Sequence, residues 1–292
     1  MAHPGIDVIR QLLGTTRPAE TTLLEGRANL AALAGSPPPP EGVALEVIEL
    51  AERPAERLTP LDAPEDQVVL YLHGGGYCSG SLDTHRGLAG ALAFASGRTV
   101  VTLDYRLAPE EPFPAALNDA LLAFDRLAPA RVALAGDSAG GGLAAATALA
   151  LRDRGGAVPV ALALLSPWVD LTQTAASYGS VGDADPMVSA AGLTQMAEGY
   201  LAGTDARTPY ASPLFGDLAG LPPMRIDVGT DEVLLDDSTS LAERATAAGV
   251  EATLEVWPDM IHVFQAFPPE LVPEAAESVT ELGAFLAQHL SS

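Results

Sequence analysis

The sequence contains no lysine, and this absence removes several kinds of chemistry. All 15 of its basic residues are arginine, against 38 acidic residues, which gives a formal net charge of −23. Without lysine there is no Schiff-base chemistry, no Ser–Lys dyad and no phosphate loop of the type that needs a lysine. The strong negative charge also argues against nucleic acids and anionic membrane surfaces as partners.

Cysteine and long apolar runs are scarce as well. A single cysteine, Cys78, excludes an internal disulfide framework and a cysteine-rich metal site. Apolar stretches stay well short of the ~20 residues that a bilayer crossing needs, so we expect no stable membrane insertion. The N-terminus lacks the basic region, apolar core and cleavage site of a secretion signal, so we expect a cytoplasmic protein.

Strand and helix patterns alternate along the main body of the chain. Apolar runs predict strands at 43–50, 67–73, 99–105, 131–137, 160–166, 224–230 and 252–258. Apolar positions three and four apart predict helices at 84–96, 115–127, 138–153, 236–248 and 273–289. Several strands are apolar throughout, as expected when helices cover both faces of a sheet. The pattern predicts an α/β fold with a mostly parallel, doubly wound sheet.

Two segments depart from this alternation. Residues 5–34 have a mainly helical pattern and lead into "GSPPPPEG" (35–42), whose four prolines favour an extended linker. The second segment, about 171–222, contains one or two helices inserted after a strand. We expect one domain over 1–292, in which about 1–40 and about 171–222 form a helical cap. Such a cap would lie over the strand ends, where open parallel sheets bind ligands.

A serine stands among small residues in "ALAGDSAGGG", directly behind the strand predicted at 131–137. Gly136 to Gly140 match G-x-S-x-G between a strand and a helix, which is the context of a nucleophile elbow. The two glycines leave room for a sharp turn that exposes Ser138, and the N–H groups after it lie at a helix N-terminus. A dinucleotide fingerprint would need G-x-G-x-x-G, which this stretch does not supply.

The glycine-rich stretch "YLHGGGYCSG" (71–80) follows another apolar strand. Three consecutive glycines let the backbone approach a ligand closely. H-G-G-G upstream of G-x-S-x-G builds an oxyanion hole in lipases and esterases. An ordinary glycine-rich turn is the alternative, but the order of the two motifs, each after a strand, favours the oxyanion hole.

A serine nucleophile needs a base that a third group orients, and this fold requires the order serine, acid, histidine. Two histidines follow Ser138. His262 lies in a loop just after a predicted strand, whereas His289 lies on the terminal helix, so His262 is the predicted base. The acid is left open between Asp231 and Glu232, which fall just past the strand end in "DVGTDEVLLDDS" (227–238).

In combination these stretches resemble the bacterial hormone-sensitive-lipase-like esterases of the α/β-hydrolase superfamily. The resemblance rests on "YLHGGGYCSGS", "LDYRLAPEEPFPAALNDA", "ALAGDSAGGGLA", "SPWVDLT", "DVGTDEVLLDDS" and "DMIHVF", and it runs from about residue 68 to 265. It implies a carboxylic ester hydrolase without a cofactor or metal, acting on small short- to medium-chain esters. By analogy alone, it also suggests a homodimer.

The resemblance also implies roles for individual residues. Ser138 would be the nucleophile and His262 the base. The family's acid-Pro-Leu-x-Asp pattern aligns with "EVLLDD", which puts Glu232 at the acid and Val233 in place of the proline, with Asp231 as the reserve acid. The oxyanion N–H groups would come from Ala139 and two of Gly74, Gly75 and Gly76.

Two other functions remain open at this point. The same triad would serve a hydrolase of lactones, carbamates or amides. A non-catalytic binding protein on this scaffold is a more remote alternative, because Ser138, His262 and candidate acids are all present. In "DYRLAPE" we expect Asp104 and Arg106 to form a buried structural pair, and we expect His73 to orient the glycine loop.

Overall fold

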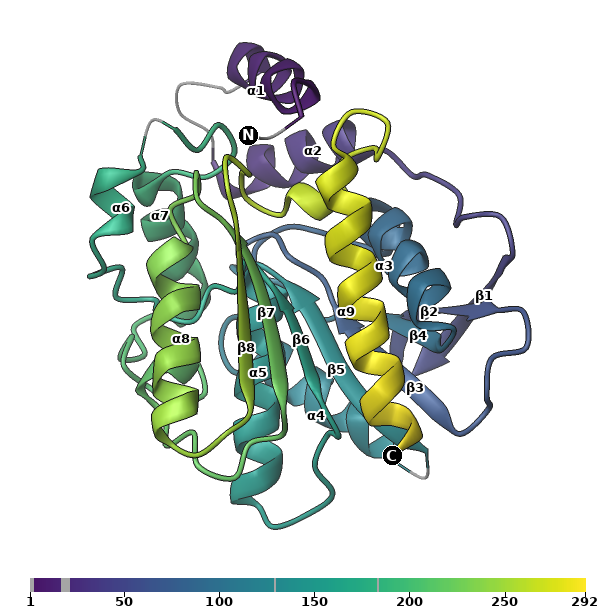
Figure 1. Ribbon diagram of the computed structural model, residues 1–292. Coiled ribbons are helices and arrows are strands. Elements are labelled where there is room, and N and C mark those ends of the chain that lie inside the picture. The colour runs from purple at the N-terminus through teal and green to yellow at the C-terminus, as the bar shows by residue number, and fades with distance from the viewer. Residues whose placement is uncertain (1–2, 17–21, 129, 183) are drawn as a thin grey trace.

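The structure, a computed structural model, describes residues 3–16, 22–128, 130–182 and 184–292. At its centre the described strands form an eight-stranded sheet in the order β1-β2-β4-β3-β5-β6-β7-β8 (Figure 1). β2 runs antiparallel to β1 and β4, and the other neighbouring strands are parallel. The strands are β1 (Val43–Leu50), β2 (Arg53–Pro60), β3 (Gln67–Leu72), β4 (Thr99–Leu103), β5 (Arg131–Asp137), β6 (Leu162–Leu165), β7 (Met224–Gly229) and β8 (Ala252–Trp257). The predicted α/β fold with a mostly parallel sheet is confirmed.

Helices cover both faces of this sheet. α3 and α9 pack on one face, and α4, α5 and α8 pack on the other. Along β3, Leu70 contributes to the core beneath α4 and α5, whereas the adjacent Tyr71 contributes to the core beneath α3 and α9. Both faces of the strand are therefore buried, which explains its uninterrupted apolar sequence. These helices are α3 (Leu82–Ser96), α4 (Ala115–Leu127), α5 (Ala139–Asp153), α8 (Leu235–Ala247) and α9 (Pro273–Ser291).

Among the strands, β2 and β6 differ most from the sequence-based expectation. The pattern does not predict β2, because its two prolines, Pro54 and Pro60, are unfavourable in a strand. They occupy the second and the last positions of β2, so the ladder between them is complete. β6 is shorter than the predicted 160–166 at both ends: it begins at Leu162, and it ends at Leu165 because Ser166 leaves the extended conformation with a φ of 45°.

Four further helices gather at one end of the sheet (Figure 1). Arg10 of the first helix donates to Asp231 and to the carbonyl of Asp259, beyond β7 and β8. Arg27 of the second donates to the carbonyl of Cys78, beyond β3. These helices are α1 (Gly5–Thr16), α2 (Leu23–Ala34), α6 (Ser177–Ser180) and α7 (Ala190–Leu201). They thus lie over the loops at the carboxyl ends of the strands, and their grouping into one cap remains a prediction.

No helix in the described part of the chain combines the length and the apolar character needed to cross a membrane.

Helices α3 and α9 come into close backbone contact at Gly283. A Cβ atom added there would lie 2.6 Å from the carbonyl carbon of Ala95 and 2.8 Å from the amide nitrogen of Ser96. Both atoms belong to the backbone of the last turn of α3, so they cannot move aside as a flexible side chain could. The glycine therefore sets the distance between the two helices on this face of the sheet.

We expect Gly283→Ala to lower the free energy of unfolding by about 1–3 kcal/mol, the usual range for overpacking. This loss outweighs the ~1 kcal/mol that alanine gains over glycine in a helix. Urea denaturation followed by circular dichroism measures it. Gly26→Ala is the matched control, because a Cβ there meets nothing within 4 Å. Equal stability of Gly283→Ala and wild type would contradict the close packing.

Candidate active site

Ser138 occupies the turn between β5 and α5. Its φ of 53° and ψ of −123° fall in a region that residues with side chains rarely adopt. The turn is tight because the first turn of α5 lies directly against the end of β3. A Cβ at Gly140 would lie 2.0 Å from the carbonyl oxygen of Leu72, and one at Gly136 would lie 2.5 Å from the backbone of Gly140. This close approach explains why both positions are glycine.

Glu232 and His262 come together from the loops that follow β7 and β8. Oε2 of Glu232 lies 2.7 Å from Nδ1 of His262, and because the carboxylate accepts, Nδ1 carries the proton. Oε1 of Glu232 accepts from the N–H of Gly229 at 2.6 Å and from Oγ of Ser166 at 2.8 Å. Glu232 is fully buried. Both of its oxygens are therefore occupied, and its orientation is fixed.

The surroundings of His262 favour its charged form. Burial lowers the pKa of His262, but the hydrogen bond and charge of Glu232, with the charges of Asp185 and Asp137, raise it above its ordinary value of 6.5. Its Nε2 faces away from Glu232. In the described part of the chain no hydrogen bond joins this nitrogen to Ser138, whose hydroxyl makes no capping bond either. The hydroxyl of Ser138 and Nε2 of His262 are thus both available to a ligand.

Asp231, the reserve acid, points elsewhere. Its Oδ2 accepts from Arg10 of α1 at 2.6 Å, and about a third of its side chain is exposed. Asp237, on the first turn of α8, accepts from the N–H groups of Val169 and Asp170. Of the two candidate acids, the structure brings Glu232 to His262 and holds Asp231 against α1.

The glycine loop after β3 offers some of the predicted oxyanion donors. The N–H of Gly74 is already engaged, since it donates to Oδ1 of Asp137 at 3.0 Å. The N–H groups of Gly75 and Gly76 donate to none of the residues that the structure describes. Ala139 opens α5, where an N–H has no acceptor within the helix. Gly75, Gly76 and Ala139 are therefore the donors available to a ligand, and Gly74 is not.

Known proteins share this architecture over the whole chain. Residues 69–266 match a protein family described by the alpha/beta hydrolase fold. An acetyl-hydrolase of Streptomyces hygroscopicus is 42% identical, over 98% of this chain and 97% of its own. The carboxylesterase NlhH of Mycobacterium tuberculosis is 34% identical, over 95% and 94%. An esterase from the bacterial hormone-sensitive lipase (HSL) family has a crystal structure with a TM-score of 0.94, 41% identity and 99% coverage of both chains.

The chain belongs to the bacterial hormone-sensitive-lipase-like esterases. It is thus an enzyme of the serine carboxylesterase class, as the sequence motifs predicted. A crystal structure of EstE5, soaked with ethyl alcohol, superposes on this esterase with a TM-score of 0.95 and 40% identity, over all of both chains.

In this esterase Asp137, the residue before the elbow serine, links several elements at the carboxyl end of β5. Its Oδ1 accepts from the hydroxyl of Tyr71 at 2.6 Å as well as from Gly74, and its Oδ2 lies 3.3 Å from Nε2 of His85. Asp137 thereby ties β5 to the glycine loop and to α3. In the sequence Asp137 stands out only as part of the G-x-S-x-G motif, and nothing there indicates that it supports the site more than its neighbours do.

The ring of His73 supports the glycine loop. Its ring stacks on Tyr105 with 4.2 Å between centroids, and its Nδ1 lies 2.8 Å from the carbonyl oxygen of Gly74. Burial and the nearby charge of His85 lower the pKa of His73 to about 3, so the ring is neutral. These contacts agree with the expected orienting role and give His73 no part in proton exchange.

The expected pair of Asp104 and Arg106 is wrong. Arg106 forms a forked ion pair with Asp119 of α4, at 2.7 Å to Oδ1, and its own N–H also donates to that carboxylate. Asp119 is 3% exposed and faces the segment after β4, so it offers both oxygens to the guanidinium. The carbonyl of Asp104 instead accepts from Arg53.

Ser166 is a residue that sequence reasoning does not find. Besides donating to Glu232, its Oγ accepts from the N–H of Val263 at 3.2 Å. It therefore connects the loop that carries Glu232 to the residue after His262. The available signal is a small polar residue directly behind an apolar strand, in "LALLSPW", which is too common to stand out.

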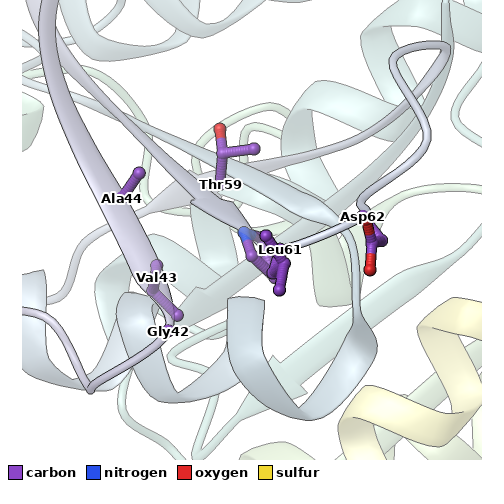
Figure 2. A pocket seen from close by; sticks show the side chains of 7 residues that line it. Gly42, Val43, Ala44, Thr59, Leu61 and Asp62 are labelled. Atoms are coloured by element: carbon purple, nitrogen blue, oxygen red, sulfur yellow. The ribbon is translucent and has the colours of Figure 1, made fainter.

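The described residues offer no cluster of three or more histidine, cysteine, aspartate and glutamate side chains to hold a metal ion. A hollow of about 520 Å³ lies beside the paired start of β1 and end of β2 (Figure 2). It contains none of the predicted site residues, and Asp62 is its one charged lining residue. Its lining consists of Gly42, Val43, Ala44, Thr59, Pro60, Leu61 and Asp62. It thus has no acid–base pair to offer.

The pair of Asp137 and His85 makes stability depend on pH. Burial opposes ionisation of both groups, yet their mutual attraction raises the pKa of His85 above 6.5 and lowers that of Asp137 below 3.8. A histidine whose pKa rises on folding contributes stability in full below its unfolded value. That contribution is lost as the pH rises through the folded value.

We therefore expect His85→Gln to be most destabilised, relative to wild type, near about pH 5.5. The difference between the two proteins should shrink as the pH rises above the unfolded histidine value of about 6.5. Urea denaturation of both proteins at several pH values measures this difference. A difference that stays constant up to about pH 8.5 would show that the pair is not ionised in the folded protein.

Proposed function

We propose that this esterase hydrolyses carboxylic esters with short to medium acyl chains through a covalent acyl-enzyme on Ser138. The observation that carries the proposal is the buried hydrogen bond of 2.7 Å between Glu232 and His262. This hydrogen bond lies beyond the carboxyl ends of β7 and β8, and Ser138 follows the carboxyl end of the parallel strand β5 on a strained strand-to-helix turn. A carboxylate, an imidazole and a serine in this fold are the components of acyl transfer.

In the proposed mechanism Ser138 attacks the carbonyl carbon of the ester while Nε2 of His262 takes its proton. Glu232 keeps the imidazole in the tautomer that accepts at Nε2 and stabilises the imidazolium. The N–H groups of Gly75, Gly76 and Ala139 would stabilise the tetrahedral oxyanion, at about 3 kcal/mol for each donor. His262 then protonates the leaving alcohol, and a water molecule repeats the sequence to release the acid.

A short acyl chain is supported by the contact between α7 and the glycine loop. A Cβ added at Gly76 would lie 2.1 Å from Sδ of Met196, so this side chain packs directly over the loop. Nearby, Tyr77 stacks on Tyr200 of α7 at 3.8 Å between ring centroids. These side chains limit the room above the oxyanion donors. The acetyl-hydrolase among the relatives is consistent with a small acyl group.

Hydrolysis of p-nitrophenyl esters from acetate to decanoate tests the nucleophile and the chain length together. We expect the wild type to favour acetate and butyrate, and Ser138→Ala to lower kcat by about 10⁵-fold or more. An organophosphate should label wild type once per chain, on the peptide that contains Ser138, and should leave the variant unlabelled. Activity on lactones, carbamates or amides with none on esters would move the proposal to those substrates.

The acid is tested by two adjacent substitutions that keep side-chain size. We expect Glu232→Gln to lower kcat by about 10³- to 10⁴-fold, because an amide cannot hold His262 in the productive tautomer. Asp231→Asn should change kcat less than about threefold, since Asp231 faces Arg10. Steady-state kinetics on p-nitrophenyl acetate gives both values. The reverse ranking would assign the acid to Asp231.

A further inference from the structure

A carboxylate from the inserted segment reaches the loop that carries Glu232. Asp185 precedes α7 and is fully buried. Its Oδ1 accepts from the N–H groups of Met187 and Val188, both at 2.9 Å, and closes a turn of its own segment. Its Oδ2 accepts from the N–H of Val233 at 3.2 Å, 48 residues along the chain. A single side chain therefore connects the insertion to the loop after β7.

The position of that contact is informative, because Val233 directly follows Glu232. The carboxylate of Glu232 is held at Gly229, Ser166 and His262, and the backbone on its other side is held by Asp185. The loop is thus fixed on both sides of the residue that faces the imidazole. A shift of the insertion would move Val233 and, with it, Glu232.

Asp185 also belongs to the electrostatic surroundings of His262. Three carboxylates influence this imidazole: Glu232 from the loop after β7, Asp185 from the insertion and Asp137 from β5. Burial and the charge of Glu232 raise the pKa of Asp185 above its ordinary value, although the charge of His262 and the N–H groups of Val188 and Met187 lower it. Asp231, next to Glu232, is compensated by Arg10. Three separate parts of the fold therefore each contribute a negative charge to the surroundings of His262.

We propose that Asp185 is a second carboxylate for His262, which positions Glu232 through Val233 and stabilises the imidazolium that forms when Ser138 is deprotonated. The inference rests on the proposed function of Ser138, Glu232 and His262. Asp185 touches neither the substrate nor the reacting atoms in this scheme, so it is a positioning residue. Through Asp185, the inserted segment thus contributes to the acid–base function of His262.

Asp185→Asn tests the proposal, because it keeps the size of the side chain and removes its charge. The amide can keep one acceptor for its own turn, but its NH₂ group cannot accept from Val233. We expect kcat on p-nitrophenyl acetate to fall about tenfold or more, with little change in KM, since an interaction of the transition state is lost.

The pH profile separates this role from a merely structural one. The acid limb of kcat/KM reports the pKa of His262 in the free enzyme, and neutral His262 is the active form. Removing a nearby negative charge makes the imidazolium lose its proton more easily. The acid limb of Asp185→Asn should therefore shift to lower pH by about half a unit or more.

Asp170→Asn is the matched control. Asp170 is also a buried aspartate, directly before the same insertion, but its carboxylate accepts from Thr172 and Thr174 in its own turn. We expect Asp170→Asn to lower thermal stability and to leave the acid limb at the wild-type pH. In Asp185→Glu, which restores the charge on a longer side chain, the limb should also stay in place while kcat falls.

Two results would overturn the proposal. One is an acid limb of Asp185→Asn that stays at the wild-type pH, together with a fall in kcat that is fully explained by a smaller fraction of enzyme that an organophosphate can label. The other, which decides the matter if Asp185→Asn does not fold, is an acid limb in Asp185→Glu displaced to lower pH. Failure of the proposed function has a different signature, since the wild type itself would then show no organophosphate labelling at Ser138.

Discussion

The contact between the first turn of α5 and the end of β3 is the constraint on which the site depends. A side chain at Gly136 or Gly140 would overlap backbone atoms, so the chain passes from strand to helix within one residue. Ser138 takes the positive φ that this requires. Ser166 and Val263, behind β6 and near His262, also have positive φ, at 45° and 47°. Strain of about 1–3 kcal/mol per residue is thus held by packing close to the proposed catalytic residues.

The buried charges around this edge form two pairs of a histidine and a carboxylate. Glu232 pairs with His262, and Asp137 pairs with His85. In the first pair Nε2 of His262 has no hydrogen bond to the described residues, whereas the second pair is tied into the glycine loop through Gly74. Other buried carboxylates have partners of two kinds: Asp119 pairs with Arg106, whereas Asp185 accepts from backbone N–H groups.

Sequence patterns predicted the features that local constraints produce. Strand runs, helix spacing and the glycines of the elbow record contacts within or next to one element, and so they can be read from the sequence. Ser166 and Asp185 could not be found this way, because each acts on a loop 66 or 48 residues distant. The family register favours Glu232 over Asp231, and the physical reason, Arg10 of α1, lies 221 residues away from Asp231.

The packing of α1 has a consequence for how the chain reaches its folded state. Ile6, Ile9 and Leu13 share a small core with Trp257, Met260, Ile261, Phe264, Val272 and Ala275, at the opposite end of the sequence. Helix α1 therefore lacks most of its native packing surface until the segment from Trp257 to Ala275 has been synthesised. Contacts of such sequence separation form late, since loop closure must precede them. Docking of α1 and completion of the loop around His262 are consequently coupled, because both depend on the segment that follows β8.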